Sequence, residues 1–301
     1  MLPLGPHSWG LNGVAALFGM SIFFTLSGFL IVGILWRDQH IGRFLTRRLA
    51  RIVPLAWLAL TIAFLVHGAT PGDWVASLLF VANLPPFHLE NVAHFWSLGV
   101  EMQFYAAIAL VVAAAGRKGL WLVPIAALAV TALRIATASP VSIVTWLRVD
   151  EILAGGCLAL IHLAPGGGQV RRWLARIPWW LLLLMTVAAC HHASSALAYL
   201  RPYLTAAMVG ALLYQPHARI RTMLESRPLA YVARISFALY VIHIFALQGW
   251  FSEGGKLVKY AKRPLSIAIT FALAHVSTTR FEAVFIRWSH NRPAPTPLSS
   301  A

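Results

Sequence analysis

Residues 94–115 read HFWSLGVEMQFYAAIALVVAAA and decide the fold. After Glu101 this run carries no charge until Arg117, and it is close to the roughly 20 residues that a helix needs to cross the hydrocarbon core of a bilayer. Burying an ionised carboxylate in hydrocarbon costs several kcal/mol. A carboxylate at such a position therefore indicates a water-filled pore, a partner group or a catalytic role. The stretch predicts a membrane helix with a functional carboxylate near its start.

The composition of the whole chain indicates the same class. Of its 301 residues, 59% are hydrophobic and 11% are charged, with a mean hydropathy of +0.73, whereas an ordinary soluble domain has about 25% charged residues. We therefore expect an integral membrane protein. The net charge of +15 is concentrated in short linkers, which is typical of membrane topology. Nucleic-acid binding would need basic residues interleaved with aromatics on a soluble face, so we expect no nucleic-acid partner.

Nine apolar stretches, including the one already described, have spanning length. They lie at about 11–35, 52–68, 96–115, 120–137, 147–163, 179–194, 201–215, 229–248 and 265–285, each near the roughly 20 residues that a span requires. The pattern predicts an all-α, polytopic transmembrane bundle of about nine to ten spans, forming a single domain over residues 1–291. The Pro- and Ser-rich tail at 292–301 is expected to be disordered.

The linkers alternate in charge. Those at 36–51, 116–119, 164–178 and 216–228 are rich in arginine, whereas those at 69–95, 138–146 and 195–200 contain no Lys or Arg. The positive-inside rule places the first set in the cytoplasm. Linker 250–264 also carries lysines, although the alternation of linkers predicts that it lies outside the cytoplasm. We interpret it as a re-entrant or interfacial segment whose lysines reach the membrane surface. The alternative is that the predicted number of helices is off by one at this point. This topology puts Met1 outside, which we explain by one further helix before Met1.

The helix expected from His94 onward would gather polar side chains on one face. His94, Ser97, Glu101 and Phe104 recur at helical spacing, within about 10 Å along the axis at roughly 1.5 Å per residue. An imidazole, a hydroxyl and a carboxylate in this arrangement can perform acid–base catalysis. The alternative is a structural hydrogen-bond network that holds Trp96 and Tyr105 at the membrane interface.

Four further segments carry candidate site residues. Arg43, Arg47, Arg48 and Arg51 precede Pro54, and their guanidinium groups match phosphate oxygens, although topology and lipid headgroups also explain them. Ser27 and Gly28 in an apolar helix favour close packing, and a serine nucleophile would need a base that this stretch does not supply.

Two later segments also place polar side chains in apolar helices. One helical face carries Ser236, Tyr240 and His243. In the other segment, Arg148 and Glu151 can neutralise one another beside a packing notch at Gly155-Gly156. Either group lines a cavity or ties helices together.

No metal site is indicated. Cys157 and Cys190 both fall in apolar segments and are interpreted as small buried hydrophobic residues. His191 and His192 are adjacent, but a third spaced ligand is missing. We therefore expect no metal cofactor.

Five segments, taken in order and spacing, resemble the acyltransferase family 3 of membrane-bound O-acyltransferases, over roughly residues 14–285. They are FFTLSGFLI (23–31), RRLARIVP (47–54), HFWSLGVEMQFY (94–105), LRVDEILAGG (147–156) and ARISFALYVIHIF (233–245). The resemblance implies a multi-pass protein of the bacterial inner membrane. It implies transfer of an acetyl or other short acyl group from coenzyme A to a hydroxyl of a carbohydrate or glycolipid, with membrane lipids as its surroundings.

The resemblance also assigns roles to residues. Arg47, Arg48 and Arg51 would bind the phosphates of acetyl-CoA or another acyl-CoA. His94 and Glu101 would lie by the cavity, and Arg148 and His243 would be polar lining residues. Our own hypothesis is that His94, in place of the family's upstream histidine, takes the hydroxyl proton and that Glu101 orients or charges it. Ser27, Ser97 and Tyr240 are further candidates for lining the cavity. Direct transfer and a serine acyl-enzyme route are both compatible with the sequence.

One departure from the family pattern leaves other functions open. The family's first helix normally carries an arginine followed eleven positions later by a catalytic histidine, and the chain starts too late to contain that pair; His7, after Pro6, has no arginine before it. The alternatives are a transporter that exports an acylated or anionic solute, because buried carboxylates also serve proton relays, and a catalytically inactive, truncated homologue.

Overall fold

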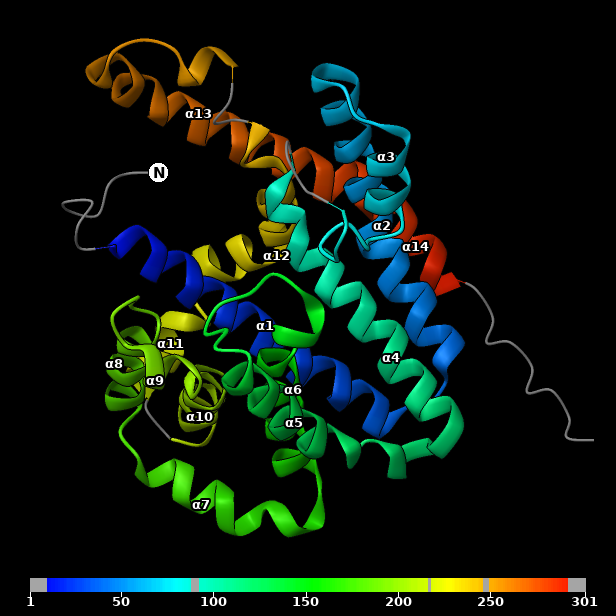
Figure 1. The fold of residues 1–301 in the computed structure, drawn as a ribbon, viewed down its shortest axis with the longest axis vertical. Coiled ribbons are helices and arrows are strands. Elements are labelled where there is room, and N and C mark those ends of the chain that lie inside the picture. Colours follow the sequence, from blue (N-terminus) through cyan, green and yellow to red (C-terminus); the bar gives the residue numbers. More distant parts are fainter. Residues whose placement is uncertain (1–9, 88–91, 216–217, 246–248, 292–301) are drawn as a thin grey trace, which may run out of the picture. The chain divides into compact units, whose positions relative to one another are not determined.

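The computed structural model of the chain describes residues 10–87, 92–215, 218–245 and 249–291. Within these ranges the regular secondary structure is helical and contains no strand (Figure 1). The predicted all-α class is therefore confirmed. His7 and the tail at 292–301, which the sequence predicts to be disordered, lie outside the described residues.

Two compact units account for the contacts of the chain, and each is described by itself. Unit 1 comprises Met1–Ile41, Leu79–Leu89 and Ala93–His217, and unit 2 comprises Gly42–Leu78, Glu90–Val92 and Ala218–Ala301. Both units are assembled from segments that are distant in sequence. The single domain over 1–291 stays a prediction.

The helices of unit 1 follow the apolar stretches of the sequence. They are α1 (Leu11–Arg37), η2 (Ala93–Phe95), α4 (Trp96–Gly119), α5 (Leu122–Ala136), η3 (Thr145–Leu147), α6 (Asp150–Leu163), η4 (Pro165–Gly167), α7 (Gly168–Arg176), α8 (Trp179–Ala189), α9 (Ser195–Ala198) and α10 (Arg201–Tyr214). Helix α4 is interrupted at Gly116, whose φ is 59°. Only a residue without a Cβ adopts this conformation readily, so the glycine separates the apolar part of α4 from Arg117 and Lys118.

Helices α1 and α6 form the closest contact of unit 1. A Cβ on Gly28 would lie 1.8 Å from the Ile152 carbonyl oxygen, and one on Gly155 would lie 1.9 Å from the Thr25 carbonyl oxygen. Each helix thus presents a glycine to the backbone of the other, which allows the two backbones to touch. The packing notch predicted at Gly155-Gly156 is confirmed, and its complement on α1 is Gly28.

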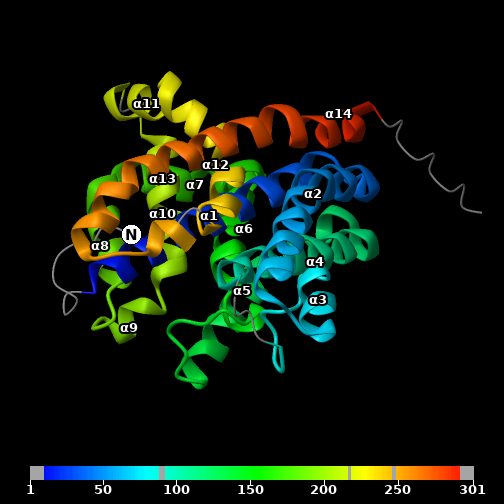
Figure 2. The same cartoon turned by 90° about the horizontal axis from the view of Figure 1, so that it is seen from above.

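Unit 2 contains the remaining helices. They are α2 (Ile41–His67), whose first residue belongs to unit 1, α3 (Pro71–Leu78), α11 (Ala218–Leu224), α12 (Arg227–Ile242), η6 (Gly249–Ser252), α13 (Lys256–Val276), the π-helical η7 (Ser277–Glu282) and α14 (Ala283–Asn291). Helix α3 folds back beside α2 (Figure 2). There Trp57 Nε1 donates to the Leu78 carbonyl oxygen at 3.0 Å, and the rings of Phe64 and Trp74 lie 5.0 Å apart.

Membrane-spanning length is met by fewer helices than the sequence suggests. Within the described residues, three helices are long and apolar enough to cross a bilayer alone: Leu11–Arg37, Ile41–His67 and Ala93–Gly119. A fourth span results if Asp150–Leu163 and Pro165–Arg176, which meet at 94°, count as one. The chain is a helical membrane protein, but the expected nine to ten spans are not confirmed, because several apolar stretches form helices that are too short or bent.

Three basic segments interpreted as linkers are helical. Arg43, Arg47, Arg48 and Arg51 lie within α2, which begins at Ile41 and not at residue 52. Arg171, Arg172 and Arg176 lie in α7, and the lysines of 250–264 lie at the start of α13. Lys262 Nζ donates to the Trp250 carbonyl oxygen at 2.8 Å and lies 4.1 Å from that indole ring. Long basic side chains with apolar stems are compatible with amphipathic helices, so charge alone placed the first residues of α2 and α13 too late in the sequence.

Candidate active site

Glu101 is the centre of a short hydrogen-bond network between α1 and α4. Its Oε1 accepts hydrogen bonds from Ser27 Oγ of α1 and from Tyr105 Oη one turn further along α4, both at 2.5 Å. Glu101 is 6% exposed and Tyr105 is 2% exposed. Both hydroxyl donors bond to one oxygen of a carboxyl group that has lost its contact with water. The arrangement fixes the Glu101 carboxyl group in the interior of unit 1.

Two of the other residues predicted on this face lie before or at the start of α4. His94 belongs to the 3₁₀ turn η2 and is half-buried, with its ring 4.6 Å from that of Phe95. Ser97 is fully buried, and its Oγ donates to the His94 carbonyl oxygen at 3.4 Å. The helix predicted to begin near His94 is present, because the 3₁₀ turn η2 runs directly into α4 and Ala93–Gly119 forms one helical span. The pairing of Glu101 with His94 stays a prediction.

Gln103 fixes the opposite side of α4 to the loop that contains Phe80 and Asn83 and to the 3₁₀ helix η3. Its Nε2 donates to the Phe80 carbonyl oxygen at 2.8 Å and to Asn83 Oδ1 at 2.9 Å, and its Oε1 accepts a 2.6 Å bond from Thr145 Oγ1. Asn83 Oδ1 lies so close to α4 that a Cβ on Gly99 would be 2.6 Å from it. Helical spacing around Glu101 indicates no role for Gln103, although Gln103 is part of the same sequence motif.

A second buried polar cluster contains Arg148. Its Nη2 lies 3.2 Å from Glu151 Oε2, which confirms that these two residues can neutralise one another. Glu151 Oε1 also accepts from Arg201 Nε at 2.8 Å and from Ser21 Oγ at 2.7 Å. The Arg148 guanidinium lies 5.3 Å from the Trp96 ring and 5.7 Å from the Phe24 ring. Helices α1, α4, α6 and α10 therefore meet at this cluster.

Arg134 and Arg201 were missed by the sequence analysis. Arg134 Nη1 bonds to Asp150 Oδ2, with both side chains 1% exposed. The sequence does contain a signal for these two arginines, because Arg134 lies in the last turn of the apolar helix α5 and Arg201 is the first residue of α10. An arginine next to hydrocarbon needs a partner, but the sequence does not say which carboxylate supplies it.

The predicted phosphate-binding arginines lie in unit 2, in the first turns of α2. Arg47 and Arg51 are exposed and four residues apart, so they share a helix face, and Arg48 is half-buried. Arg51 also attracts the buried carboxylate of Glu282, which accepts bonds from Ser277 Oγ at 2.9 Å and Thr278 Oγ1 at 3.2 Å. Exposed guanidinium groups on one helix face can bind phosphate oxygens.

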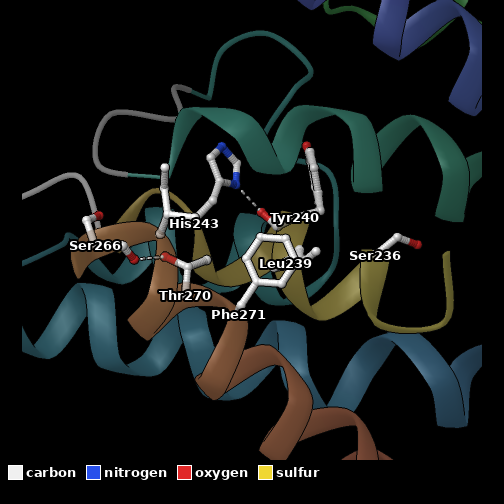
Figure 3. A pocket seen from close by; sticks show the side chains of 8 residues that line it. Ser236, Leu239, Tyr240, His243, Ser266, Thr270 and Phe271 are labelled. Carbon is white, nitrogen blue, oxygen red and sulfur yellow. Dashed lines mark hydrogen bonds between the residues drawn. The ribbon is translucent and has the colours of Figure 1, made fainter. Parts of the chain in front are cut away.

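Tyr240 and His243 line a pocket within unit 2, between α12 and α13 (Figure 3). Its volume is about 460 Å³, and its other walls are Ser236, Leu239, Ser266, Ile267, Thr270 and Phe271. His243 Nδ1 lies 2.6 Å from the Tyr240 carbonyl oxygen, and Thr270 Oγ1 donates to the Ser266 carbonyl oxygen at 2.7 Å. The pocket is mostly apolar with a few hydroxyls, which is typical of sites for small organic groups.

Groups that could hold a metal do not gather in the part of the chain that the structure describes. Among the described residues, no three His, Cys, Asp or Glu side chains come together as a metal site would require. Cys157 is partly buried and Cys190 is buried, and both are free thiols. Neither contributes to the polar clusters described above.

Comparison with known proteins identifies a shared family. A family model described as an acyltransferase domain matches residues 2–278. No solved structure matches the chain.

Three curated relatives illustrate how far the similarity extends. Peptidoglycan O-acetyltransferase OatA of Listeria monocytogenes is 30% identical over 33% of the chain and 19% of its own length. O-acetyltransferase OatA of Staphylococcus aureus is 30% identical over 31% of the chain and 20% of its own length. An uncharacterized protein of Haemophilus influenzae is 32% identical over 33% of the chain and 50% of its own length. The chain thus spans about a fifth of the two O-acetyltransferases.

Proposed function

Because the chain belongs to this acyltransferase family, with residues 2–278 matched, we propose that it transfers an acetyl or other short acyl group from coenzyme A to a carbohydrate hydroxyl in the bacterial inner membrane. The family membership confirms the resemblance seen in the sequence. The names of the two relatives as O-acetyltransferases, and their bacterial sources, support an oxygen acceptor and a bacterial membrane.

One observation carries the proposal. Glu101 is a buried carboxylate held by Ser27 and Tyr105 at 2.5 Å each, inside a protein with membrane-spanning helices. A fixed negative charge in a low-dielectric interior is costly and favours a positive charge that forms near it. Glu101 is thus suited to stabilise an imidazole that takes up a proton.

The reaction we propose is a direct transfer. The acceptor hydroxyl gives its proton to His94 while its oxygen attacks the thioester carbonyl. The new C–O bond forms and the C–S bond breaks, and the departing thiolate of coenzyme A takes the proton back from His94. His94 is half-buried and therefore more accessible than Ser27, which is 8% exposed and tied to Glu101. This difference favours the direct route over an acyl-serine intermediate.

The donor would be bound through its phosphates. Arg47 and Arg51 are exposed on one face of α2, and guanidinium groups bind phosphate oxygens in a bidentate way. The pocket lined by Tyr240 and His243 has the size and apolar character to hold a small organic group of either substrate. We propose it as a substrate subsite in unit 2.

The decisive experiment measures acyl transfer in membranes. Membranes containing the chain are incubated with radiolabelled acetyl-CoA and a panel of bacterial surface glycans, and label on the glycan is quantified. Transfer that depends on Glu101 supports the proposal. If the chain is inserted and folded but no glycan is labelled above the Glu101→Gln background, the proposal fails.

A further inference from the structure

The cluster around Arg148 contains more buried positive charge than its own carboxylates balance. Three guanidinium groups, those of Arg134, Arg148 and Arg201, are 0–1% exposed, and so are the two carboxylates of Asp150 and Glu151. Arg134 bonds to Asp150, whereas Arg148 and Arg201 share Glu151. Within this cluster one positive charge is therefore left without a counter-ion.

The unbalanced charge lies on Arg148 and Arg201. Among the described residues, Nε and Nη1 of Arg148 and Nη1 and Nη2 of Arg201 have no hydrogen-bond acceptor. Within the described ranges Arg148 Nη2 has only its 3.2 Å ion pair with Glu151 Oε2, and neither that oxygen nor Asp150 Oδ1 accepts a hydrogen bond. Thr25 Oγ1, one turn from Ser21 on α1, is also buried without a partner in this part of the structure. Such a concentration of buried donors is unusual, because native proteins pair nearly all of them.

Neither loss of charge nor a more distant acid relieves this imbalance. Arginine keeps its proton in proteins, so burial does not neutralise it. Glu101 Oε1 is held by the hydroxyls of Ser27 and Tyr105, and the charges that act on Arg148 are those of Glu151, Arg201, Asp150 and Arg134. An uncompensated ion in the interior of a membrane protein costs several kcal/mol. The physical expectation is an additional negative group in contact with the two arginines.

The geometry of the donors indicates the class of that group. Arg148 and Arg201 each offer at least two nitrogen atoms of one planar guanidinium, and such forks match the two oxygens of a carboxylate. The excess of a single charge fits a monovalent anion. Because Arg148 and Arg201 are fully buried and the Trp96 and Phe24 rings lie against Arg148, the anion must be compact.

We infer that Arg148 and Arg201 form a buried binding site for a small monovalent carboxylate of the size of acetate. Glu151 and Ser21 hold the two guanidinium groups in place from α6 and α1. Bound acetate would close the contact between α1, α6 and α10 and stabilise unit 1. This inference is independent of the proposed acyl transfer, since it is tested by binding and unfolding.

The first test is binding of acetate to the purified full chain in detergent micelles. Radiolabelled acetate is measured by equilibrium dialysis, with potassium gluconate, a carboxylate too large for the site, as the background salt. We expect one saturable acetate per chain and a rise of several degrees in the melting temperature on saturation. Absence of saturable binding overturns the inference, and equal competition by chloride overturns the assignment to a carboxylate.

Variants locate the site. Arg201→Met removes the excess charge and should weaken acetate binding at least tenfold, whereas Arg172→Met on the exposed face of α7 should leave it unchanged. Glu151→Gln raises the excess charge by one and should strengthen binding. A purely structural role of the cluster predicts no gain in binding for Glu151→Gln. Unchanged acetate binding in folded Arg201→Met and Arg148→Met, or weaker binding in folded Glu151→Gln, contradicts the site.

Discussion

The hydroxyl of Ser27 donates a 2.5 Å hydrogen bond to Glu101 Oε1, which joins α1 to α4 across 74 residues of sequence. Ser27, which the sequence pattern indicates only as a packing residue, is thus a direct partner of the carboxylate. Because α1 is also in backbone contact with α6 through Gly28 and Gly155, the position of Glu101 depends on the packing of both helices.

Glu101→Gln should abolish acyl transfer without removing the protein from the membrane. The amide keeps the shape of the side chain and can still accept from Ser27 and Tyr105, but it carries no charge. Loss of a positioned charged group in an active site commonly lowers rates by about 10²–10³-fold. Label transfer from acetyl-CoA and the amount of membrane-inserted protein are measured together. Full activity would remove Glu101 from the mechanism.

Ser27→Ala separates the two chemical routes. Direct transfer predicts residual activity, because Tyr105 still holds Glu101, whereas an acyl-serine route predicts none. We expect a reduction of about tenfold, which corresponds to roughly 1.4 kcal/mol for one hydrogen bond to a charged group. Trapping of labelled acyl groups on the protein after acid quench provides a second readout. Covalent label that disappears in Ser27→Ala would contradict the direct route.

Gly28→Ala should disrupt the contact between α1 and α6. Its added methyl group would lie 1.8 Å from the Ile152 carbonyl oxygen, so the backbones must separate. Overpacking costs about 1–3 kcal/mol or more, and we expect a lower melting temperature in detergent. Gly19→Ala on the same helix is the matched control, because nothing lies within 4 Å of its Cβ position. Equal melting temperatures for the two variants would show that the close approach is unimportant.

Arg134→Met should destabilise the protein by about 3–5 kcal/mol, since it leaves the Asp150 carboxylate buried and without its ion-pair partner. Asp38→Asn is the control, because the Asp38–His40 pair at 2.6 Å is largely exposed and such pairs contribute about 0–1 kcal/mol. The double variant Arg134→Met/Asp150→Leu should recover much of the loss. Thermal unfolding in detergent measures all three, and a fully additive double variant would contradict the pairing.

Arg47→Gln/Arg51→Gln should raise the KM for acetyl-CoA at least tenfold while leaving kcat nearly unchanged, because the arginines are proposed to hold phosphates remote from the reacting carbon. The effect should diminish when dephospho-CoA thioesters are used. Arg172→Gln, an exposed arginine of α7, serves as control for net charge. A fall in kcat with constant KM would argue against a role in donor binding.

Leu239→Trp should test the pocket between α12 and α13. The larger side chain fills part of the roughly 460 Å³ that Leu239, Tyr240 and His243 enclose with α13. If the pocket holds a substrate group, kcat/KM falls at least tenfold. Leu265→Trp, beside the pocket on α13 and 51% exposed, should have little effect. The same kcat/KM in both variants would exclude the pocket from substrate binding.

The sequence by itself determined the helical class, the membrane setting, the family and the burial of Glu101. These properties follow from hydropathy, from helical spacing and from local motifs, which act over one segment at a time. The same signals placed helix ends wrongly at α2 and α13, because basic residues in amphipathic turns look like linkers when only charge is considered.

Only the tertiary structure decided which side chains meet. Ser27 pairs with Glu101, Arg201 with Glu151 and Arg134 with Asp150, and each pair joins different helices. Helical periodicity fixes the face on which a residue lies but not the neighbour that this face meets. That choice depends on the rotation and approach of whole helices, which here is set by steric contacts such as those of Gly28 and Gly155.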